Sequence, residues 1–228
     1  MLLSALLRDA KIEYSGADCE ITRVVCDSRE AMAGTLFVCI TGFASDGHEY
    51  AKSAYERGCR AFAAERELSL PSDAIVVMCE NTRKSLALIS AAYYGFPAQK
   101  MKIVGITGTK GKTTTALMLA SLANKSGISA GYIGSNGIDF DDCHFETKNT
   151  TPESIDLHRY FAEMVKKNVR VVFVEVSSQA LYLDRVFGID FYATVFTNLA
   201  PDHIGGIEHP TFEHYRDSKK KLFCDYTS

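Results

Sequence analysis

The sequence predicts an α/β protein in two parts: a small αβ domain followed by a domain with a phosphate-binding loop and a mostly parallel sheet. Three observations predict this class. Short apolar runs alternate with helical patterns along the 228 residues, which is typical of parallel sheets covered by helices on both faces. A glycine-rich loop at residues 107–112 joins one apolar run to a helix. A Pro-containing segment, Phe96–Lys100, separates two such α/β patterns.

Residues 1–97 form the first predicted domain. Met1–Leu7 has the pattern of an amphipathic helix. Asn81 is a suitable N-cap for a helix that runs to Tyr94 and ends at Gly95. Strands are expected at 21–26, 35–40, 61–64 and 74–78, a further helix at 49–57, and turn-rich polar loops at 27–29 and 41–48.

Residues 98–228 form the second predicted domain. A new unit is expected here because Pro97 disfavours continuation of the preceding helix. Strands are expected at 103–106, 130–134, 169–176 and 191–198, a hairpin or loop at 137–148, and helices at 113–125 and from Pro152 to about 167. The strands are nearly continuous apolar runs with helices between them, which favours a parallel sheet.

The loop Thr107–Lys112 is the strongest functional signal. Its glycines let backbone N–H groups approach phosphate oxygens, the following helix adds partial positive charge, and Lys112 adds a full one. Thr113 supplies the hydroxyl that such loops place on magnesium. The usual pattern puts its first glycine where this chain has Ile106, so the alternative is a glycine turn with a chance lysine. The loop alone indicates a nucleoside triphosphate and no particular reaction.

Three further residues are candidates for the same site. Glu175 ends an apolar strand, where ligands gather in open α/β sheets, and its carboxylate can hold the magnesium that bridges phosphates. A strand-end acid on the surface is the alternative. His203 is either a ligand or a histidine satisfied within its loop. Lys219 is followed by two more lysines. From the residues alone, this run of charge predicts a solvated helix face.

Composition excludes several other classes of function. The net charge of −3 gives no electrostatic case for nucleic acid or an anionic membrane. No apolar run approaches the roughly 20 residues of a membrane span, and the N-terminus lacks the features of a signal peptide. Seven cysteines without a C-x-x-C pair argue against a disulfide framework or a zinc site. Cys26, Cys39 and Cys79 are expected to be small core residues in a cytoplasmic protein.

Together these residues resemble the Mur ligases of bacterial cell-wall synthesis, and the resemblance covers the whole chain. Thr107–Thr115 resembles their ATP loop, and Tyr215-x-x-x-Lys219 resembles the segment that carries a carbamylated lysine. Three later segments resemble further motifs of the family and occur in the same order: Asn149–Pro152, Glu175–Ser178 and Asn198–His203. Asp27–Arg29 and Asp46–His48 point to the branch of the family that adds the third residue of the peptide.

The resemblance implies roles for several of the matched residues. The first domain would hold the uridine diphosphate end through Cys26, Ser28, Phe43, Ala44 and Ser45. The muramoyl-dipeptide would be held by Asn149, Thr150, Thr151, Ser177 and Arg185. ATP would be held by Gly108, Thr109, Lys110, Gly111, Lys112, Thr113 and Thr114. Magnesium would be organised by Thr113, Glu175, His203 and Lys219. The catalytic residues would be Lys112, Glu175, His203 and carbamylated Lys219. Related sequences often carry His at positions 43 and 179, which are Phe and Gln here.

The resemblance also implies the reaction. A cytoplasmic, ATP-dependent amide ligase adds a diamino acid to UDP-N-acetylmuramoyl-L-Ala-D-Glu through an acyl phosphate. Lys112 and magnesium stabilise the charge on phosphoryl oxygens, and carbamylation of Lys219 makes it an anion that attracts magnesium. The complete enzyme is expected to be a monomer with a C-terminal domain that selects lysine or diaminopimelate. This chain, ending at Ser228, is expected to lack that domain, to expose a sheet edge, and not to complete amide synthesis.

Three other functions stay open at this point. A folylpolyglutamate-type ligase would share the fold, although Asp27–Arg29 in the first domain argues against it. A P-loop kinase or NTPase switch would need the loop and not the first domain. A truncated, non-catalytic binding module is the third alternative.

Overall fold

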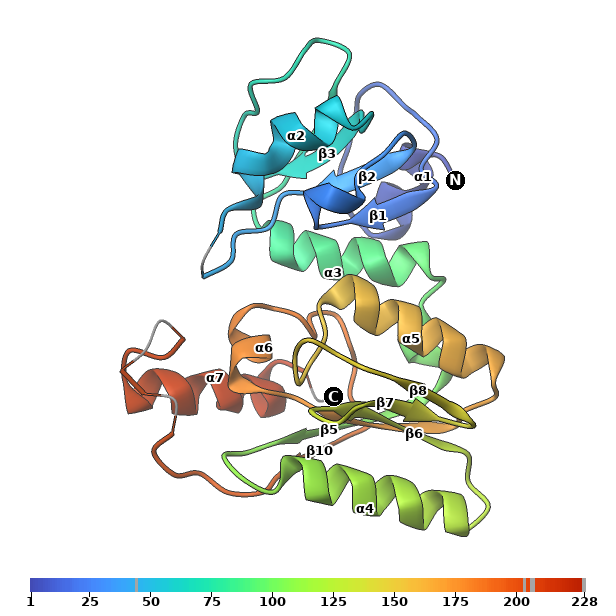
Figure 1. Cartoon of the computed structure of the whole chain (residues 1–228), viewed down its shortest axis with the longest axis vertical. Helices are drawn as coiled ribbons and strands as arrows, with labels where there is room; N and C mark the ends of the chain where they lie inside the picture. The colour runs from blue at the N-terminus through green and yellow to red at the C-terminus, as the bar shows by residue number, and fades with distance from the viewer. Residues whose placement is uncertain (44, 203, 206–207, 227–228) are drawn as a thin grey trace. The chain divides into compact units, whose positions relative to one another are not determined.

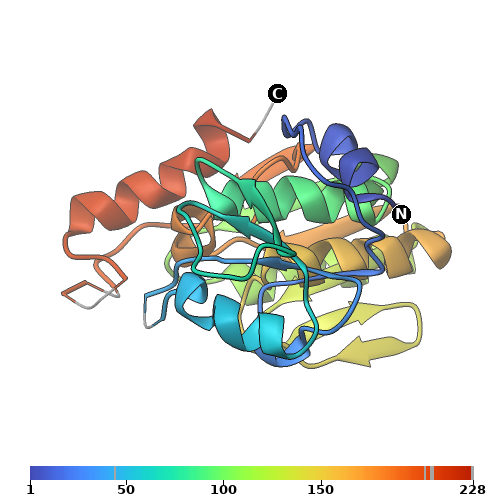
Figure 2. The same cartoon turned by 90° about the horizontal axis from the view of Figure 1, so that it is seen from above.

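The computed structural model describes residues 1–43, 45–202, 204–205 and 208–226. The chain divides into two compact units, Met1–Tyr93 and Tyr94–Ser228. Each unit has its own sheet with helices packed on it (Figures 1 and 2). The predicted α/β class with parallel sheets is therefore confirmed. The functional assignment of residues 1–97 and 98–228 as two domains remains a proposal.

The first unit contains a four-stranded sheet in the order β1-β2-β3-β4, with all neighbouring strands parallel. The strands are β1 Arg23–Val25, β2 Thr35–Val38, β3 Ala61–Ala64 and β4 Ile75–Met78. The helices are α1 Leu3–Asp9, α2 Ala51–Glu56 and α3 Thr82–Tyr93, with short 3-10 helices η1 Ser28–Glu30 and η2 Gly47–Tyr50. Phe37 and Phe62 meet edge to face in the core, beside Ala54 of α2. Of the cysteines expected in the core, Cys39 is buried, while Cys26 and Cys79 are half-buried.

The polar loop before α2 is fixed by its own side chains. The Asp46 carboxylate accepts the backbone N–H of His48 at 3.0 Å and contacts the His48 Nδ1 at 2.6 Å. His48 Nε2 accepts the backbone N–H of Glu65 at 3.0 Å, so Nδ1 carries the ring proton. A Cβ at position 47 would lie 2.8 Å from the Ile40 nitrogen, which only glycine avoids. The expected helix at 49–57 therefore begins as a 3-10 turn capped by Asp46, and α2 proper starts at Ala51.

The second unit contains a six-stranded sheet in the order β10-β5-β9-β6-β7-β8. Its four strands from β10 to β6 are parallel, and β7 and β8 continue it as an antiparallel hairpin. The strands are β5 Lys102–Thr107, β6 Ala130–Gly134, β7 Gly137–Phe140, β8 Cys143–Phe145, β9 Val171–Glu175 and β10 Ala193–Phe196. The helices are η3 Pro97–Lys100, α4 Lys112–Lys125, α5 Ser154–Lys166, α6 Ser178–Tyr182 and α7 Phe212–Cys224. The segment predicted as a hairpin or loop is thus a hairpin, while α6 was not predicted.

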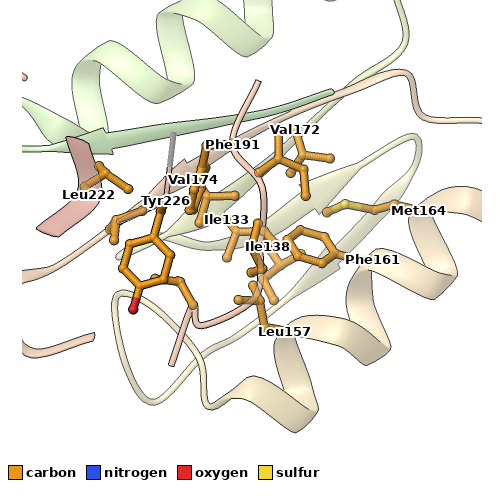
Figure 3. Packing of buried hydrophobic residues seen from close by; sticks show 14 of the residues in the cluster. Ile133, Ile138, Leu157, Phe161, Met164, Val172, Val174, Phe191, Leu222 and Tyr226 are labelled. Carbon is orange, nitrogen blue, oxygen red and sulfur yellow. The ribbon is translucent and has the colours of Figure 1, made fainter. Parts of the chain in front are cut away.

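Helices cover both faces of this second sheet. In Figure 1, α4 lies on one face and α5 on the other. Figure 3 shows Phe161 and Met164 of α5 packed with Ile133 and Val172 of the sheet. On the opposite face, Ala116 and Ala120 of α4 pack with a second apolar cluster that includes Val104, Ile106, Tyr132 and Phe173. This packing holds the parallel strands in a fixed register.

The register brings three strand ends together. Ile106 of β5 pairs with Glu175 of β9, and Thr107 pairs with Phe196 of β10. The loop after β5, the carboxylate that ends β9 and the segment after β10 therefore meet at the carboxyl edge of the sheet. In open α/β folds this edge is where ligands bind.

None of the helices in the described part of the chain is long and apolar enough to cross a membrane.

His158 of α5 is expected to make the fold sensitive to acid. Its ring is buried, and neither ring nitrogen has a hydrogen-bond partner among the described residues. Burial lowers the pKa of His158 to about 4, against about 6.5 in an unfolded chain. Below pH 6.5 the unfolded chain binds a proton that the folded chain does not, so folding stability falls by about 3 kcal/mol between pH 6.5 and pH 4.

Urea unfolding at pH 7 and pH 4.5 measures this effect. The His158→Leu variant keeps a similar side-chain volume and removes the titrating ring, so it should lose less stability over this interval than the unaltered chain. An equal loss in both proteins would show that other groups set the acid sensitivity.

Candidate active site

The loop between β5 and α4 is shaped by two glycines and held by the segment after β10. Gly108 and Gly111 have φ values of +144° and +83°, which favour glycine. A Cβ at Gly108 would lie 2.0 Å from the Thr197 hydroxyl. The backbone N–H of Thr109 donates to the Asn198 carbonyl at 2.9 Å, and that of Lys110 to the Asn198 side-chain oxygen at 3.0 Å. The Asn198 segment is therefore part of the loop's support.

Lys112 places its ammonium inside the loop. Its Nζ donates to the Gly108 carbonyl at 2.9 Å and to the Thr109 carbonyl at 3.2 Å. Burial is the main cause that lowers the pKa of Lys112. A phosphate is a stronger partner for this ammonium than two neutral carbonyls, because its negative charge adds Coulomb attraction to the hydrogen bond. The side chain is thus placed to meet an anion held by the loop.

Glu175 is fully buried, with 0% of its surface exposed. The alternative of a surface acid at this strand end is therefore wrong. One carboxylate oxygen, Oε2, accepts the Thr113 hydroxyl at 2.9 Å. The other oxygen, Oε1, accepts the Tyr132 hydroxyl at 2.6 Å and the backbone N–H of Ser135 at 3.0 Å.

Lys219 is also buried, with 3% of its surface exposed, whereas its neighbour Lys220 is exposed. The expectation of a solvated helix face is therefore wrong for Lys219. Its Nζ donates to the Gly108 carbonyl at 3.0 Å and lies 4.4 Å from the centre of the Tyr215 ring. Burial, and then the nearby Lys112 charge, lower the pKa of Lys219 to about 7. Its amine is therefore partly neutral near neutral pH.

These groups surround one cavity of about 400 Å³. Nine of the predicted site residues line it: Thr109, Lys110, Gly111, Lys112, Thr113, Thr150, Glu175, Ser177 and Lys219. The lining also includes Ser135, Ser178, Gln179, Glu208 and Tyr215. Sequence reasoning assigned none of these a role in the site. Ser135 follows β6 directly, so the strand-end rule that selected Glu175 would have found it.

Five further predicted residues of this unit lie outside the cavity lining. Gly108 and Thr114 belong to the loop and the first turn of α4, and Asn149 precedes Thr150. The buried Thr151 hydroxyl donates to the Glu175 backbone carbonyl at 2.7 Å. Arg185 is buried, with its Nε donating to the Glu153 carboxylate at 2.8 Å. Among the described residues, these five are not part of the cavity lining.

The residues predicted to hold the uridine diphosphate end lie in the first unit. Cys26 and Ser28 follow β1, where the Asp27 side chain caps the short helix η1 that begins at Ser28. Phe43 and Ser45 belong to the loop between β2 and η2. Ala44, and His203 of the second unit, lie outside the described residues.

Thr113 and Glu175 together fit a magnesium ion. No group of three or more His, Cys, Asp or Glu side chains that could hold a metal occurs in the described part of the chain. Magnesium needs few protein ligands, because it takes one or two carboxylates and fills its octahedron with phosphate and water oxygens. The Thr113 and Glu175 oxygens are 2.9 Å apart, and neighbouring corners of an octahedron with Mg–O distances of about 2.05 Å are about 2.9 Å apart.

A parallel sheet, a glycine loop around Lys112 and a buried carboxylate at the end of the neighbouring strand β9 make up the strand–loop–helix arrangement of P-loop α/β folds. Residues 106–228 match the family described as Mur ligase middle domain. Residues 20–94 match the family described as Mur ligase family, catalytic domain. The chain belongs to the Mur ligase family.

Curated relatives include two proteins named UDP-N-acetylmuramoyl-L-alanyl-D-glutamate–2,6-diaminopimelate ligase. The one from Clostridium botulinum is 43% identical over 207 residues, which are 90% of this chain and 42% of the relative. The one from Bacillus licheniformis is 44% identical over 211 residues, 92% of this chain and 42% of the relative. The chain thus spans less than half the length of these relatives.

Two solved structures show the same fold. One, titled as a UDP-N-acetylmuramoyl-L-alanyl-D-glutamate–2,6-diaminopimelate ligase, has a TM-score of 0.79 at 24% identity and covers 96% of this chain and 44% of that chain. The other is a MurF ligase from Thermotoga maritima in complex with ADP, with a TM-score of 0.56 at 21% identity, covering 88% of this chain and 42% of that chain. At these identities the similarity concerns the fold.

Proposed function

We propose that this chain is the UDP-sugar-binding and ATP-binding part of a UDP-N-acetylmuramoyl-tripeptide synthetase. Such an enzyme joins a diamino acid to UDP-N-acetylmuramoyl-L-alanyl-D-glutamate at the expense of ATP. The observation that carries the proposal is that Lys112, Glu175 and Lys219 converge on one cavity at the carboxyl edge of the sheet. The names of the relatives favour 2,6-diaminopimelate as the diamino acid.

The reaction has two steps. A carboxylate oxygen of the dipeptide bonds to the γ-phosphorus of ATP while the bond to ADP breaks, which gives an acyl phosphate. The amine of the diamino acid then bonds to the acyl carbon, loses a proton, and expels inorganic phosphate. Both steps concentrate negative charge on phosphoryl oxygens. Fixed positive groups that face this charge lower the barrier, because they need no reorganisation during the reaction.

This chain's own residues supply those groups. The Lys112 ammonium and the backbone N–H groups at the start of α4 face the cavity side of the loop, where they bind and orient the phosphates. Thr113 and Glu175 would hold the magnesium ion, which when bound neutralises phosphate charge. The hydroxyls of Ser135 and Thr150 are 2.9 Å apart on the lining, and with Ser177 they would orient the dipeptide carboxylate.

Thr151 and Arg185 would act on the same substrate through Ser177, and Asn149, which precedes Thr150, would also hold it. The Thr151 hydroxyl accepts the Ser177 backbone N–H at 3.1 Å, and the Arg185 guanidinium donates to the Thr151 carbonyl at 3.2 Å. These bonds hold Ser177 at the cavity. In the first unit, Cys26, Ser28 and the 43–45 loop would bind the uridine diphosphate end, and His203 would join Glu175 at the metal. The proposal also includes that the complete enzyme is a monomer and that it acts in the cytoplasm.

Lys219 would act as a carbamate. The neutral amine bonds to carbon dioxide and loses one proton, which replaces an ammonium beside the magnesium site by an anion. An ammonium there would repel the cation, whereas a carbamate attracts it. Burial supports this role, because it favours the neutral amine that reacts with carbon dioxide.

Calorimetry with the 228-residue chain tests the proposed function. A non-hydrolysable ATP analogue with magnesium and UDP-N-acetylmuramoyl-L-Ala-D-Glu should each bind. UDP-N-acetylglucosamine, which lacks the dipeptide, should bind more weakly than the second ligand. Binding of the ATP analogue without binding of the muramoyl-dipeptide would overturn the ligase proposal and favour a simple P-loop NTPase.

Ser28→Ala is expected to weaken the UDP-sugar about tenfold or more and to leave the ATP analogue unchanged. A hydrogen bond to a charged group contributes roughly 1.5–3 kcal/mol, and Ser28 lies in the first unit, whereas the phosphate loop lies in the second. Ser72→Ala, at an exposed position of the first unit, is the matched control. Equal loss of both ligands in Ser28→Ala would assign Ser28 a structural role instead.

A further inference from the structure

Tyr132 is a buried polar group beside the catalytic cavity that the proposed mechanism has not used. It lies on β6 and is 1% exposed. Its hydroxyl donates to Glu175 Oε1 at 2.6 Å. The same hydroxyl accepts the backbone N–H of Asn136 at 3.2 Å. Because the amide can only donate, the tyrosine proton is directed at the carboxylate.

The turn after β6 is built around the same carboxylate oxygen. The backbone N–H of Ser135 gives Oε1 a second hydrogen bond, at 3.0 Å. A Cβ at Gly134 would lie 2.1 Å from Oε1 and 2.3 Å from the Tyr132 hydroxyl oxygen. Glycine at this position therefore lets the carboxylate and the tyrosine meet. Two donors hold Oε1, and Oε2 alone faces Thr113.

We propose that Tyr132 is a positioning residue that makes Glu175 a one-oxygen metal ligand and thereby selects magnesium over calcium. This inference rests on the proposed function, because it requires a nucleotide-bound cation at Thr113 and Glu175. Tyr132 does not touch the cation in this arrangement. It acts by keeping Oε1 occupied and the plane of the carboxylate fixed.

The two cations differ in what they require of a carboxylate. Magnesium takes six ligands in a near-ideal octahedron at about 2.0–2.1 Å, whereas calcium takes about six to eight at 2.3–2.6 Å and accepts both oxygens of one carboxylate. A carboxylate held by Tyr132 and Ser135 offers the single oxygen that suits magnesium. A carboxylate released from Tyr132 can turn and offer both, which suits the larger ion.

Tyr132→Phe removes the hydroxyl and keeps the ring, so it tests the inference directly. Binding of a non-hydrolysable ATP analogue to the 228-residue chain is measured by calorimetry in Mg²⁺ and, separately, in Ca²⁺. The unaltered chain should bind more tightly in Mg²⁺. The ratio of the two affinities should fall about tenfold in Tyr132→Phe, since one charge-assisted hydrogen bond is lost. Tyr160→Phe on α5 is the matched control and should keep the ratio.

The possible outcomes separate this inference from the proposed function. No binding by the unaltered chain in either ion would overturn the proposed function, and the inference with it. Normal Mg²⁺-dependent binding with an unchanged ratio in Tyr132→Phe would overturn the inference alone, as would an equal loss in both ions. In Gly134→Ala the added Cβ displaces the carboxylate, so binding should weaken in both ions, and an unaffected Gly134→Ala would also contradict the inference.

Discussion

Replacing Lys112 by methionine is expected to lower the affinity for a non-hydrolysable ATP analogue by about tenfold to a hundredfold. Methionine keeps most of the apolar stem and removes the ammonium. The ammonium now donates to the Gly108 and Thr109 carbonyls, and with nucleotide bound it would donate to phosphate. Hydrogen bonds to charged groups contribute roughly 1.5–3 kcal/mol each, which corresponds to this range of affinity.

Calorimetry with Lys125→Met provides the control for Lys112→Met. Lys125 is an exposed residue at the other end of the same helix, so its loss should leave the affinity unchanged. Circular dichroism should show both variants folded, because neither side chain contributes to an apolar cluster. Unchanged nucleotide affinity in Lys112→Met would show that the glycine loop is a turn with a chance lysine.

Much of the second unit could be predicted because its local signals agree with one another. The apolar run of β5, the glycine loop and the helical pattern of α4 each indicate the same strand–loop–helix unit. Parallel register then places Glu175 near that loop, since Ile106 pairs with Glu175. Neighbouring strand ends in a parallel sheet meet at one edge, and this rule needs no knowledge of tertiary packing.

Lys219, which only the family resemblance placed in the site, shows where reasoning from residue patterns reached its limit. Its neighbours Lys220 and Lys221 suggest a charged, solvated helix face, and only the docking of α7 distinguishes the three. Tyr215, one turn earlier on α7, donates to the Thr109 hydroxyl at 3.1 Å. This contact turns Lys219 toward Gly108 and leaves Lys220 in solvent. A contact between residues 106 positions apart leaves no local pattern in the sequence.

The short helix α6 and Tyr132 escaped prediction for different reasons. Helix α6 has five residues, too few to show a 3.6-residue period, and only its Ser177 cap marks it. Tyr132 sits in an apolar strand, where a tyrosine ring is an ordinary core residue. Its importance comes from the hydroxyl, whose partner Glu175 lies on a neighbouring strand 43 positions later in the chain.

The carbamate proposed for Lys219 predicts a new signal in the ¹³C NMR spectrum of the 228-residue chain in ¹³C-labelled bicarbonate. The signal should grow between pH 6 and pH 8. With a pKa of about 7, the neutral amine rises from about a tenth to about nine tenths of the total over this interval, and only the neutral form bonds to carbon dioxide. Lys219→Ala should lose the signal, and Lys220→Ala, at an exposed position of the same helix, should retain it.

Replacing Lys219 should change the turnover of the complete ligase more than it changes the NMR spectrum, so turnover is the sharper test of the carbamate. In a ligase that extends this chain by the C-terminal part of its relatives, Lys219→Ala should lose nearly all formation of UDP-muramoyl-tripeptide, measured by mass spectrometry. A small added carboxylate such as formate should restore part of it, because the site needs an anion beside the cation. Lys219→Arg keeps the positive charge and cannot form the carbamate, so it should be inactive with or without formate. An active Lys219→Arg enzyme would rule out the carbamate.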